Sequence, residues 1–124
     1  MRKLKLPGRD QTRPRLSEDD VELIQSLGIN NIREQARGMV ERYLKRPQSD
    51  KKVPTAGNPV YKAMHACNCS SRRELSRAHK IPASGQLSKR DKESIVNLLT
   101  RWIAREYNFF KEEKEVQQGE LGDF

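Results

Sequence analysis

Apolar residues recur at helical spacing near the start of the chain. Val21, Ile24 and Leu27 fall on one face of a helix, and the segment 17–20 before them (Ser-Glu-Asp-Asp) is typical of a capped helix start with acids in its first turn. Gly28 favours a helix end because glycine adopts the left-handed backbone of a C-terminal cap. The pattern predicts a helix between Ser17 and Gly28.

A longer pattern runs from Ile32 to Leu44. Its six apolar residues are spaced at i, i+4, i+7, i+8, i+11 and i+12, which is the periodicity of an amphipathic helix. Asn30 or Asn31 is placed to cap this helix, and Pro47 ends it.

The middle of the chain is less regular. The stretch 47–59 contains three prolines, a glycine and mostly polar residues, which predicts a loop. A short apolar turn comes next, over 60–64. Ser71 and Glu74 have the spacing of a capping box, and they predict a short helix that ends at about His79.

The last pattern is the most regular in the chain. Ser88 and Asp91 form a second capping box, and the helix after it is predicted to run to Phe110, beyond which it either continues or frays. Its apolar residues are Ile95, Leu98, Leu99, Trp102 and Ile103. No sustained alternation predicts a strand. We therefore expect an all-α fold, a compact bundle of three to five helices.

The chain of 124 residues is long enough for one domain. We divide it into a basic flexible arm (1–15), a single helical domain (16–110) and an acidic tail (111–124). It contains no apolar run long enough to span a membrane and no secretory signal. Two cysteines do not make a disulfide scaffold, so we expect an intracellular protein, in the cytoplasm, nucleoid or nucleus.

Positive charge dominates the surface chemistry. The chain carries 25 Lys and Arg against 17 Asp and Glu, a net charge of +8. A basic surface attracts polyanions, of which DNA or RNA is the commonest, whereas the arm lacks the apolar face of a membrane-binding segment. The cations expected to contact nucleic acid are Arg2, Lys3, Lys5, Arg9, Arg13, Arg15, Arg72, Arg73, Arg77, Lys80, Lys89 and Arg90.

Part of this set lies in a possible DNA-reading motif. Arg73, Arg77 and Lys80 share one helical face, and the stretch 74–87 resembles the start of a helix-turn-helix. The resemblance is imperfect, because Lys80 stands where glycine is usual and Leu87 comes one residue late. The alternative is an ordinary solvated face.

Two histidines and two cysteines fall within fifteen positions. His65, Cys67, Cys69 and His79 have the chemistry of a zinc shell, but the gap between the cysteines is tighter than usual, and buried thiols more often pack as small hydrophobes. We expect no metal and no cofactor, with these four residues as weak metal candidates. The sequence also lacks a phosphate-binding glycine loop and a nucleophile elbow, so we expect no catalytic residues.

The segment Gly-Asn-Pro-Val-Tyr-Lys-Ala-Met-His-Ala at 57–66, together with the residues after it, resembles a family of small, mostly bacterial proteins defined as a domain of unknown function. Its signature continues as Cys-Cys-Arg-x-Cys-Leu and Trp-His-x-Ile-Pro. The matching positions are Gly57, Pro59, Val60, Ala63, His65, Ala66, Arg72, Leu75, His79, Ile81, Pro82, Leu87, Trp102 and Ile103.

This chain departs from that signature at its cysteines. The family's cysteine positions hold Ser70, Ser71 and Glu74 here, and its first tryptophan is Ala78. If the family's thiols hold a metal, this chain lacks that site. Three polar residues of the signature are retained in this chain: His65, Arg72 and His79. They could form either a small anion site or a structural hydrogen-bond network.

The sequence therefore predicts a small, non-catalytic protein that binds the nucleic-acid backbone electrostatically. Such a protein could be a component of a larger nucleoprotein assembly. The first alternative is a protein-interaction module, or a subunit of a complex, in which the acidic tail docks a partner or folds back on the arm. The second is an enzyme or metal-binding protein that uses His65 and His79.

Overall fold

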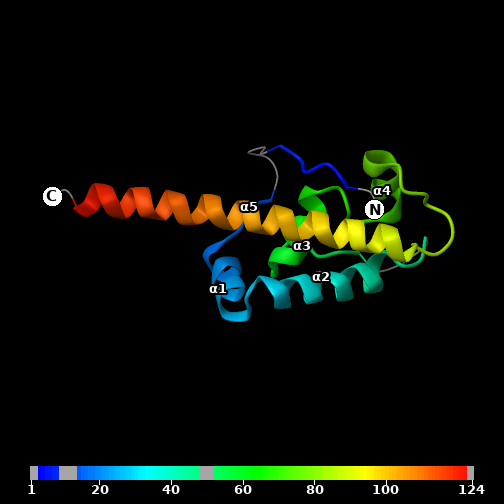
Figure 1. Cartoon of the computed structure of the whole chain (residues 1–124), viewed down its shortest axis with the longest axis horizontal. Coiled ribbons are helices and arrows are strands. Elements are labelled where there is room, and N and C mark those ends of the chain that lie inside the picture. The colour runs from blue at the N-terminus through cyan, green and yellow to red at the C-terminus, as the bar shows by residue number, and fades with distance from the viewer. Residues whose placement is uncertain (1–2, 9–13, 48–51, 123–124) are drawn as a thin grey trace.

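The computed structural model describes residues 3–8, 14–47 and 52–122, with side chains as far as residue 113. Figure 1 shows its helices, and no strand occurs in these ranges. The all-α prediction is confirmed. The five helices are α1 (Glu18–Leu27), α2 (Ile29–Leu44), α3 (Pro59–Ala66), α4 (Arg72–His79) and α5 (Lys89–Gly122).

The helices α2 and α5 form the central pair. Their side chains meet in ion pairs, with Arg37 Nη2 2.9 Å from Glu93 Oε1 and Lys92 Nζ 2.7 Å from Glu41 Oε1. Residue numbers rise along α2 as they fall along α5, so the two helices are antiparallel. The shorter helices α1 and α3 pack against this pair, and α3 contacts both of its members.

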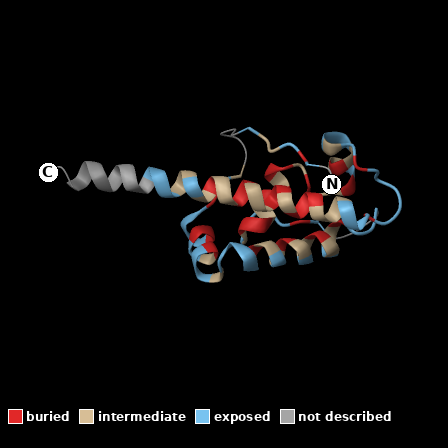
Figure 2. Cartoon of the chain, viewed as in Figure 1, coloured by how far each residue is buried: buried red, intermediate tan, exposed pale blue. Residues whose placement is uncertain are grey.

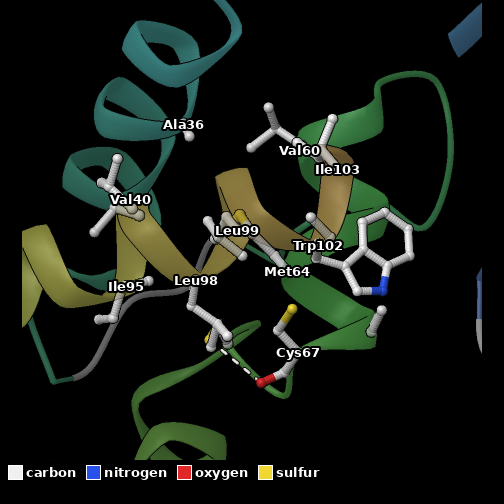
Figure 3. Packing of buried hydrophobic residues seen from close by; sticks show 14 of the residues in the cluster. Ala36, Val40, Val60, Met64, Cys67, Ile95, Leu98, Leu99, Trp102 and Ile103 are labelled. Atoms are coloured by element: carbon white, nitrogen blue, oxygen red, sulfur yellow. Dashed lines mark hydrogen bonds between the residues drawn. The ribbon is translucent and has the colours of Figure 1, made fainter. Parts of the chain in front are cut away.

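The hydrophobic core lies where α2, α3 and α5 meet. Figure 3 shows side chains from all three helices directed into one cluster, and Figure 2 shows the buried residues concentrated there. The first half of α5 supplies more of the large buried side chains than any other element. The labelled members are Ala36, Val40, Val60, Met64, Cys67, Ile95, Leu98, Leu99, Trp102 and Ile103.

The N-terminal residues belong to this folded body. Leu4 is 4% exposed and joins the core, and Leu6 packs against it. Guanidinium groups of α5 hold the same segment, because Arg101 donates to the carbonyl of Leu4 and Arg105 to that of Pro7. The sequence predicted a flexible arm over residues 1–15, whereas residues 4–7 of it contact the core and α5 here.

The helix α2 begins earlier than the sequence predicted. Gly28, with φ +81°, both caps the end of α1 and precedes the first residue of α2. The chain thus turns between two helices at one glycine, and no side chain caps α2. Asn31, predicted as a possible cap, donates instead from Nδ2 to the carbonyl of Leu27 at 2.7 Å.

The helix α5 begins as predicted but is longer. The backbone N–H of Asp91 donates to Ser88 Oγ at 3.1 Å, which caps the start. The helix then passes Phe110 and ends at Gly122, so most of the acidic tail continues the same helix. Figure 1 shows α5 extending past the body of the protein.

The Arg37–Glu93 pair gives the stability a dependence on pH. Hydrogen bonds from Arg37 lower the pKa of the Glu93 carboxyl below its ordinary value of 4.5. A carboxyl whose pKa is lowered by folding stabilises the native state above its unfolded pKa, and this contribution disappears as the pH falls through the folded pKa.

We expect Glu93→Gln to be less stable than the wild type at pH 7, and the difference to shrink as the pH falls below 4.5 and through the lowered pKa of the folded state. Urea unfolding between pH 3 and pH 7 measures the difference. Glu22→Gln, which removes an exposed carboxylate from α1, is the control, and we expect its difference in unfolding free energy from the wild type not to change with pH. If the difference for Glu93→Gln were also independent of pH, the prediction would be contradicted.

Candidate nucleic-acid interface

Eight exposed cations gather at one end of the protein, which we call the basic end. They come from the end of α2, from α4 with the residue after it, and from the first turn of α5. Figure 1 shows these three segments at the same end of the bundle, opposite the projecting end of α5. The basic end comprises Arg42, Lys45, Arg46, Arg73, Arg77, Lys80, Lys89 and Arg90.

One buried side chain ties α4 and the loop after it to the end of α2. The guanidinium of Arg72, a residue 4% exposed, lies among five backbone carbonyls. Its Nη1 donates to carbonyls at 3.0–3.3 Å and its Nη2 at 2.6 and 3.3 Å. The acceptors of Nη1 are Leu44, Lys45 and Gly85, and those of Nη2 are Pro82 and Ser84.

The physical reason for this arrangement is the C-terminus of α2. The last carbonyls of a helix have no partner within it, and they carry the negative end of the helix dipole. The positive charge of Arg72 satisfies two of them, at Leu44 and Lys45. The backbone N–H of Leu87 adds a second tie, donating to the carbonyl of Lys45 at 3.0 Å.

This environment removes Arg72 from the predicted set of surface cations. Burial lowers the pKa of its guanidinium, and the carboxylate of Asp91 acts in the opposite direction. With its donors directed at carbonyls of the chain, Arg72 does not reach a phosphate outside. The sequence predicted a contact between Arg72 and nucleic acid, whereas the structure buries this side chain and directs its terminal nitrogens at backbone carbonyls.

Both histidines also donate to backbone carbonyls. His65 Nε2 lies 2.9 Å from the carbonyl oxygen of Val53, and His79 Nε2 lies 2.7 Å from that of Cys67. A carbonyl only accepts, so each Nε2 carries its proton. Of the two interpretations of the trio of His65, Arg72 and His79, this geometry fits the structural hydrogen-bond network, which joins α3 and α4 to neighbouring loops.

The two cysteines are buried and form no disulfide. The Cys69 thiol donates to the carbonyl of Cys67 at 3.4 Å, the dashed line in Figure 3. Burial raises the pKa of Cys69 well above its ordinary value, with smaller effects from Cys67 and Glu74. Throughout residues 3–8, 14–47 and 52–122, no group of three His, Cys, Asp or Glu side chains is placed to hold a metal ion.

The structure does not form a helix-turn-helix at residues 74–87. The helices α4 and α5 are separated by residues 80–88, whereas the motif joins its helices with a turn of about three or four residues. Lys80 does adopt the left-handed conformation (φ +57°) at the end of α4, the position where the motif favours glycine. The basic residues around it therefore belong to a surface, not to a recognition helix.

The other predicted cations are more dispersed. Lys3, Lys5 and Arg15 are exposed on the N-terminal segment, outside the basic end. The predicted positions Arg2, Arg9 and Arg13 lie outside the described residues. Sequence analysis missed the cations at the end of α2, although their clustering after an amphipathic pattern was a usable signal: Arg42, Lys45 and Arg46.

The acidic segment lies far from the basic end. Glu112 and Glu113 are exposed on the same straight helix that begins at Lys89. At a rise of 1.5 Å per residue, about 35 Å of helix separates them from Lys89, which exceeds the Debye length of about 8–10 Å at moderate salt. This path does not fold the tail back onto the N-terminal segment, as one alternative supposed.

A comparison with protein families agrees with the resemblance seen in the sequence. The pattern of the domain of unknown function DUF4186 matches residues 6–104. The chain belongs to this family. The DUF4186 match begins within the docked N-terminal segment and ends in the middle of α5, so it covers the core. No curated protein and no solved structure matches the chain.

The residues that carry the resemblance serve the DUF4186 fold. Most of them are buried, including Leu75, Ile81 and Trp102, and Pro59 is the first residue of α3. Ser71 caps α4 by accepting from the backbone N–H of Glu74 at 3.1 Å. In the part of the chain that is described, no helix has the length and apolarity needed to cross a membrane.

Proposed function

We propose that this DUF4186 protein binds nucleic acid through the basic end, without catalysis. The observation that carries the proposal is the gathering of eight exposed cations from three segments at one end of the bundle (Figure 1). Positive charge that is clustered and held in place favours phosphate contacts and counterion release. Such contacts position a nucleic acid without reading its sequence.

Two acids near these cations, Glu41 and Asp91, are engaged within the protein. Glu41 pairs with Lys92 at 2.7 Å and with Lys45 at 4.0 Å, and hydrogen bonding to Lys92 lowers the pKa of its carboxyl. Asp91 lies in the capped first turn of α5 and acts on the buried Arg72. The basic end therefore presents an excess of positive charge to solvent.

The start of α5 strengthens the case for an anionic partner. A helix N-terminus carries partial positive charge, so acids are favourable there and cations are not. The first two residues of α5 are nevertheless Lys89 and Arg90, both exposed. A phosphate bound beside this turn would relieve the repulsion.

Backbone contacts dominate in this proposal because aromatic residues for base stacking are scarce. Tyr43 is the aromatic residue nearest the basic end in sequence, and its side chain is half-buried. Its ring packs edge-on against the ring of Tyr61. The guanidinium carbon of Arg42 lies over the Tyr43 ring, 5.7 Å from its centroid. Stacking on successive bases needs open ring faces, so a strong preference among sequences is not expected.

Fluorescence anisotropy with labelled DNA and RNA, single- and double-stranded, tests the proposal. The test variant carries Arg73→Gln, Arg77→Gln and Arg90→Gln, and the control carries Lys5→Gln, Arg15→Gln and Lys111→Gln. Both lose three exposed charges, but only the first loses them from the basic end. We expect the test variant to bind at least tenfold more weakly and its salt slope to fall by about 2–3.

Two outcomes would overturn the proposal. The first is no binding by the wild type to any of the four nucleic acids at low salt, which would favour an acidic protein partner. The second is equal weakening in the test and control variants, which would mean that net charge alone, not the basic end, attracts the polyanion. A control within about threefold of the wild type supports the assignment.

A further inference from the structure

A cavity lies on the side of the protein between the N-terminal segment, α2 and α5. Its volume is about 420 Å³, which is within the range of small-molecule sites. Figure 1 shows the N-terminal segment running beside α5, and Leu4 of this segment forms one wall. The cavity shares no residue with the basic end.

The charged groups around the cavity are all positive. Lys3, Arg33 and Arg101 line it from three different segments, and the described residues of its lining include no Asp or Glu. One turn further along α2, Arg37 meets the carboxylate of Glu93, whereas Arg33 meets the neutral amide of Asn97. The ion-pair pattern between α2 and α5 is thus interrupted at the cavity.

Both guanidinium groups retain donors for a ligand. Each arginine side chain has five N–H donors. Among the described residues, Arg33 donates to Asn97 Oδ1, and Arg101 donates to the backbone carbonyl of Leu4. A carboxylate or phosphate accepts two parallel N–H bonds from one guanidinium, so the remaining donors suit an anionic head group.

The rest of the lining is apolar or neutral. Leu4 and Ala104 present hydrocarbon, and the Thr100 hydroxyl is occupied, donating to the carbonyl of Val96 at 2.7 Å. An inorganic ion would leave this apolar surface uncovered. The lining therefore matches a molecule that combines an anionic head with an apolar body.

We infer that this cavity binds a small amphiphilic organic anion, with its carboxylate or phosphate head between Arg33 and Arg101 and its apolar body against Leu4 and Ala104. This site is additional to the proposed nucleic-acid interface and does not depend on it. Because Leu4 forms a wall and its carbonyl binds Arg101, an occupied cavity would also hold the N-terminal segment against α5.

Titration of the full-length ¹⁵N-labelled protein, followed by amide chemical shifts, tests this inference. The probes are octanoate, octyl phosphate, octanol and inorganic phosphate. We expect saturable shifts at Arg33, Asn97 and Arg101 with octanoate or octyl phosphate, and at least tenfold weaker binding of octanol and of inorganic phosphate. The stronger of the two amphiphiles identifies the head group.

Arg33→Gln and Arg42→Gln are the matched variants. Both remove one cation from α2, but Arg42 is exposed and lies outside the cavity. We expect Arg33→Gln to weaken binding of the preferred amphiphile at least tenfold, Arg33→Lys to weaken it less, and Arg42→Gln to change it less than twofold. Thermal unfolding of each variant confirms that it is folded.

The inference fails if neither amphiphile gives saturable shifts around the cavity, if octanol binds as tightly as octanoate, or if Arg33→Gln and Arg42→Gln behave alike. The triple variant of the basic end separates the two proposals. If it loses nucleic-acid binding and still binds the amphiphile, the two sites are independent. If the wild type binds the amphiphile but no nucleic acid, the proposed nucleic-acid-binding function is overturned and the cavity inference stands.

Discussion

Replacing Arg72 with Met is expected to lower the free energy of unfolding by about 3 kcal/mol. The substitution keeps an apolar stem of similar length but removes all five hydrogen bonds that the guanidinium makes. A buried carbonyl left without a donor costs about 1–3 kcal/mol. Water reaches some of the five, because Pro82, Ser84 and Gly85 are exposed, so the costs do not add in full.

The expected damage is local as well as global. Without the guanidinium, the loop after α4 keeps one described tie to the end of α2, from the N–H of Leu87 to the carbonyl of Lys45. We therefore expect faster amide exchange over residues 80–88 in Arg72→Met, together with weaker nucleic-acid binding if the basic end is the interface. Arg72→Lys should fall between the wild type and Arg72→Met, because an ammonium has three donors and no planar fork.

Arg73→Met is the matched control for Arg72→Met. It removes the same charge from the next residue of the same helix, but Arg73 is exposed. Surface substitutions of this kind change stability by about 0.5 kcal/mol or less. Urea unfolding of both variants measures the difference. Equal stabilities would mean that the carbonyl contacts of Arg72 contribute nothing, and its structural role would be disproved.

Local sequence patterns predicted the helices well because their causes are local. Ser17, Ser71 and Ser88 each accept from the backbone N–H three residues later, as their spacing indicated. The apolar periodicity between Ile95 and Ile103 likewise places those side chains in the core. A cap or a helical face is specified within a few residues, and a reader of the sequence sees all of them.

The role of Arg72 was beyond such patterns. Its acceptors lie 10–28 residues away in sequence, and in sequence it resembles its neighbour Arg73. The two arginines differ in burial, since Arg72 is buried and Arg73 is exposed. That difference depends on how α4 packs against the end of α2. The same holds for residues 3–8, whose composition suggested a solvated arm. One leucine, Leu4, reaches the core and two arginines of α5 hold its backbone.

The candidate interface was predicted in part for the same reason. The sequence identified basic residues near Arg73 and Lys89, but it did not join them to the cations at the end of α2. Backbone carbonyls accept the hydrogen bonds that bring α4 and its loop to the end of α2. Every residue has a backbone carbonyl, so no sequence motif marks the ones that take part. Clusters built on such contacts become visible only in three dimensions, whereas net charge is visible at once.

A second large effect is expected at Asp20, where removal of the carboxylate by Asp20→Ala should cost about 3 kcal/mol. The sequence marked this residue only as part of a helix cap. In the structure its Oδ2 accepts from the backbone N–H of Ser17 at 2.9 Å and from Lys62 Nζ at 2.6 Å. Both side chains of the ion pair are largely buried, at 5% exposure for Asp20 and 13% for Lys62.

This pair fastens α1 to α3. Lys62 Nζ also donates to the carbonyl of Arg15 at 3.0 Å, so one ammonium joins the segment before α1 to the cap of α1. Deleting one partner of a buried pair leaves the other charge desolvated and unpaired, which costs more than the pair itself contributes. Asp20→Asn should be milder, since the amide oxygen still accepts from Ser17 while the charge is lost.

A double-mutant cycle isolates the pair. Asp20→Asn and Lys62→Met are measured singly and together by urea unfolding, with Asp19→Ala as the control for an exposed acid in the same helical turn. Since the double variant contains no unpaired charge, we expect it to be more stable than the sum of the single losses predicts, by about 1 kcal/mol or more. Additive losses would mean that the two charges do not interact, and the attachment of α1 would then rest on its apolar face at Val21 and Ile24 and on contacts such as the hydrogen bond from Gln25 to Tyr107.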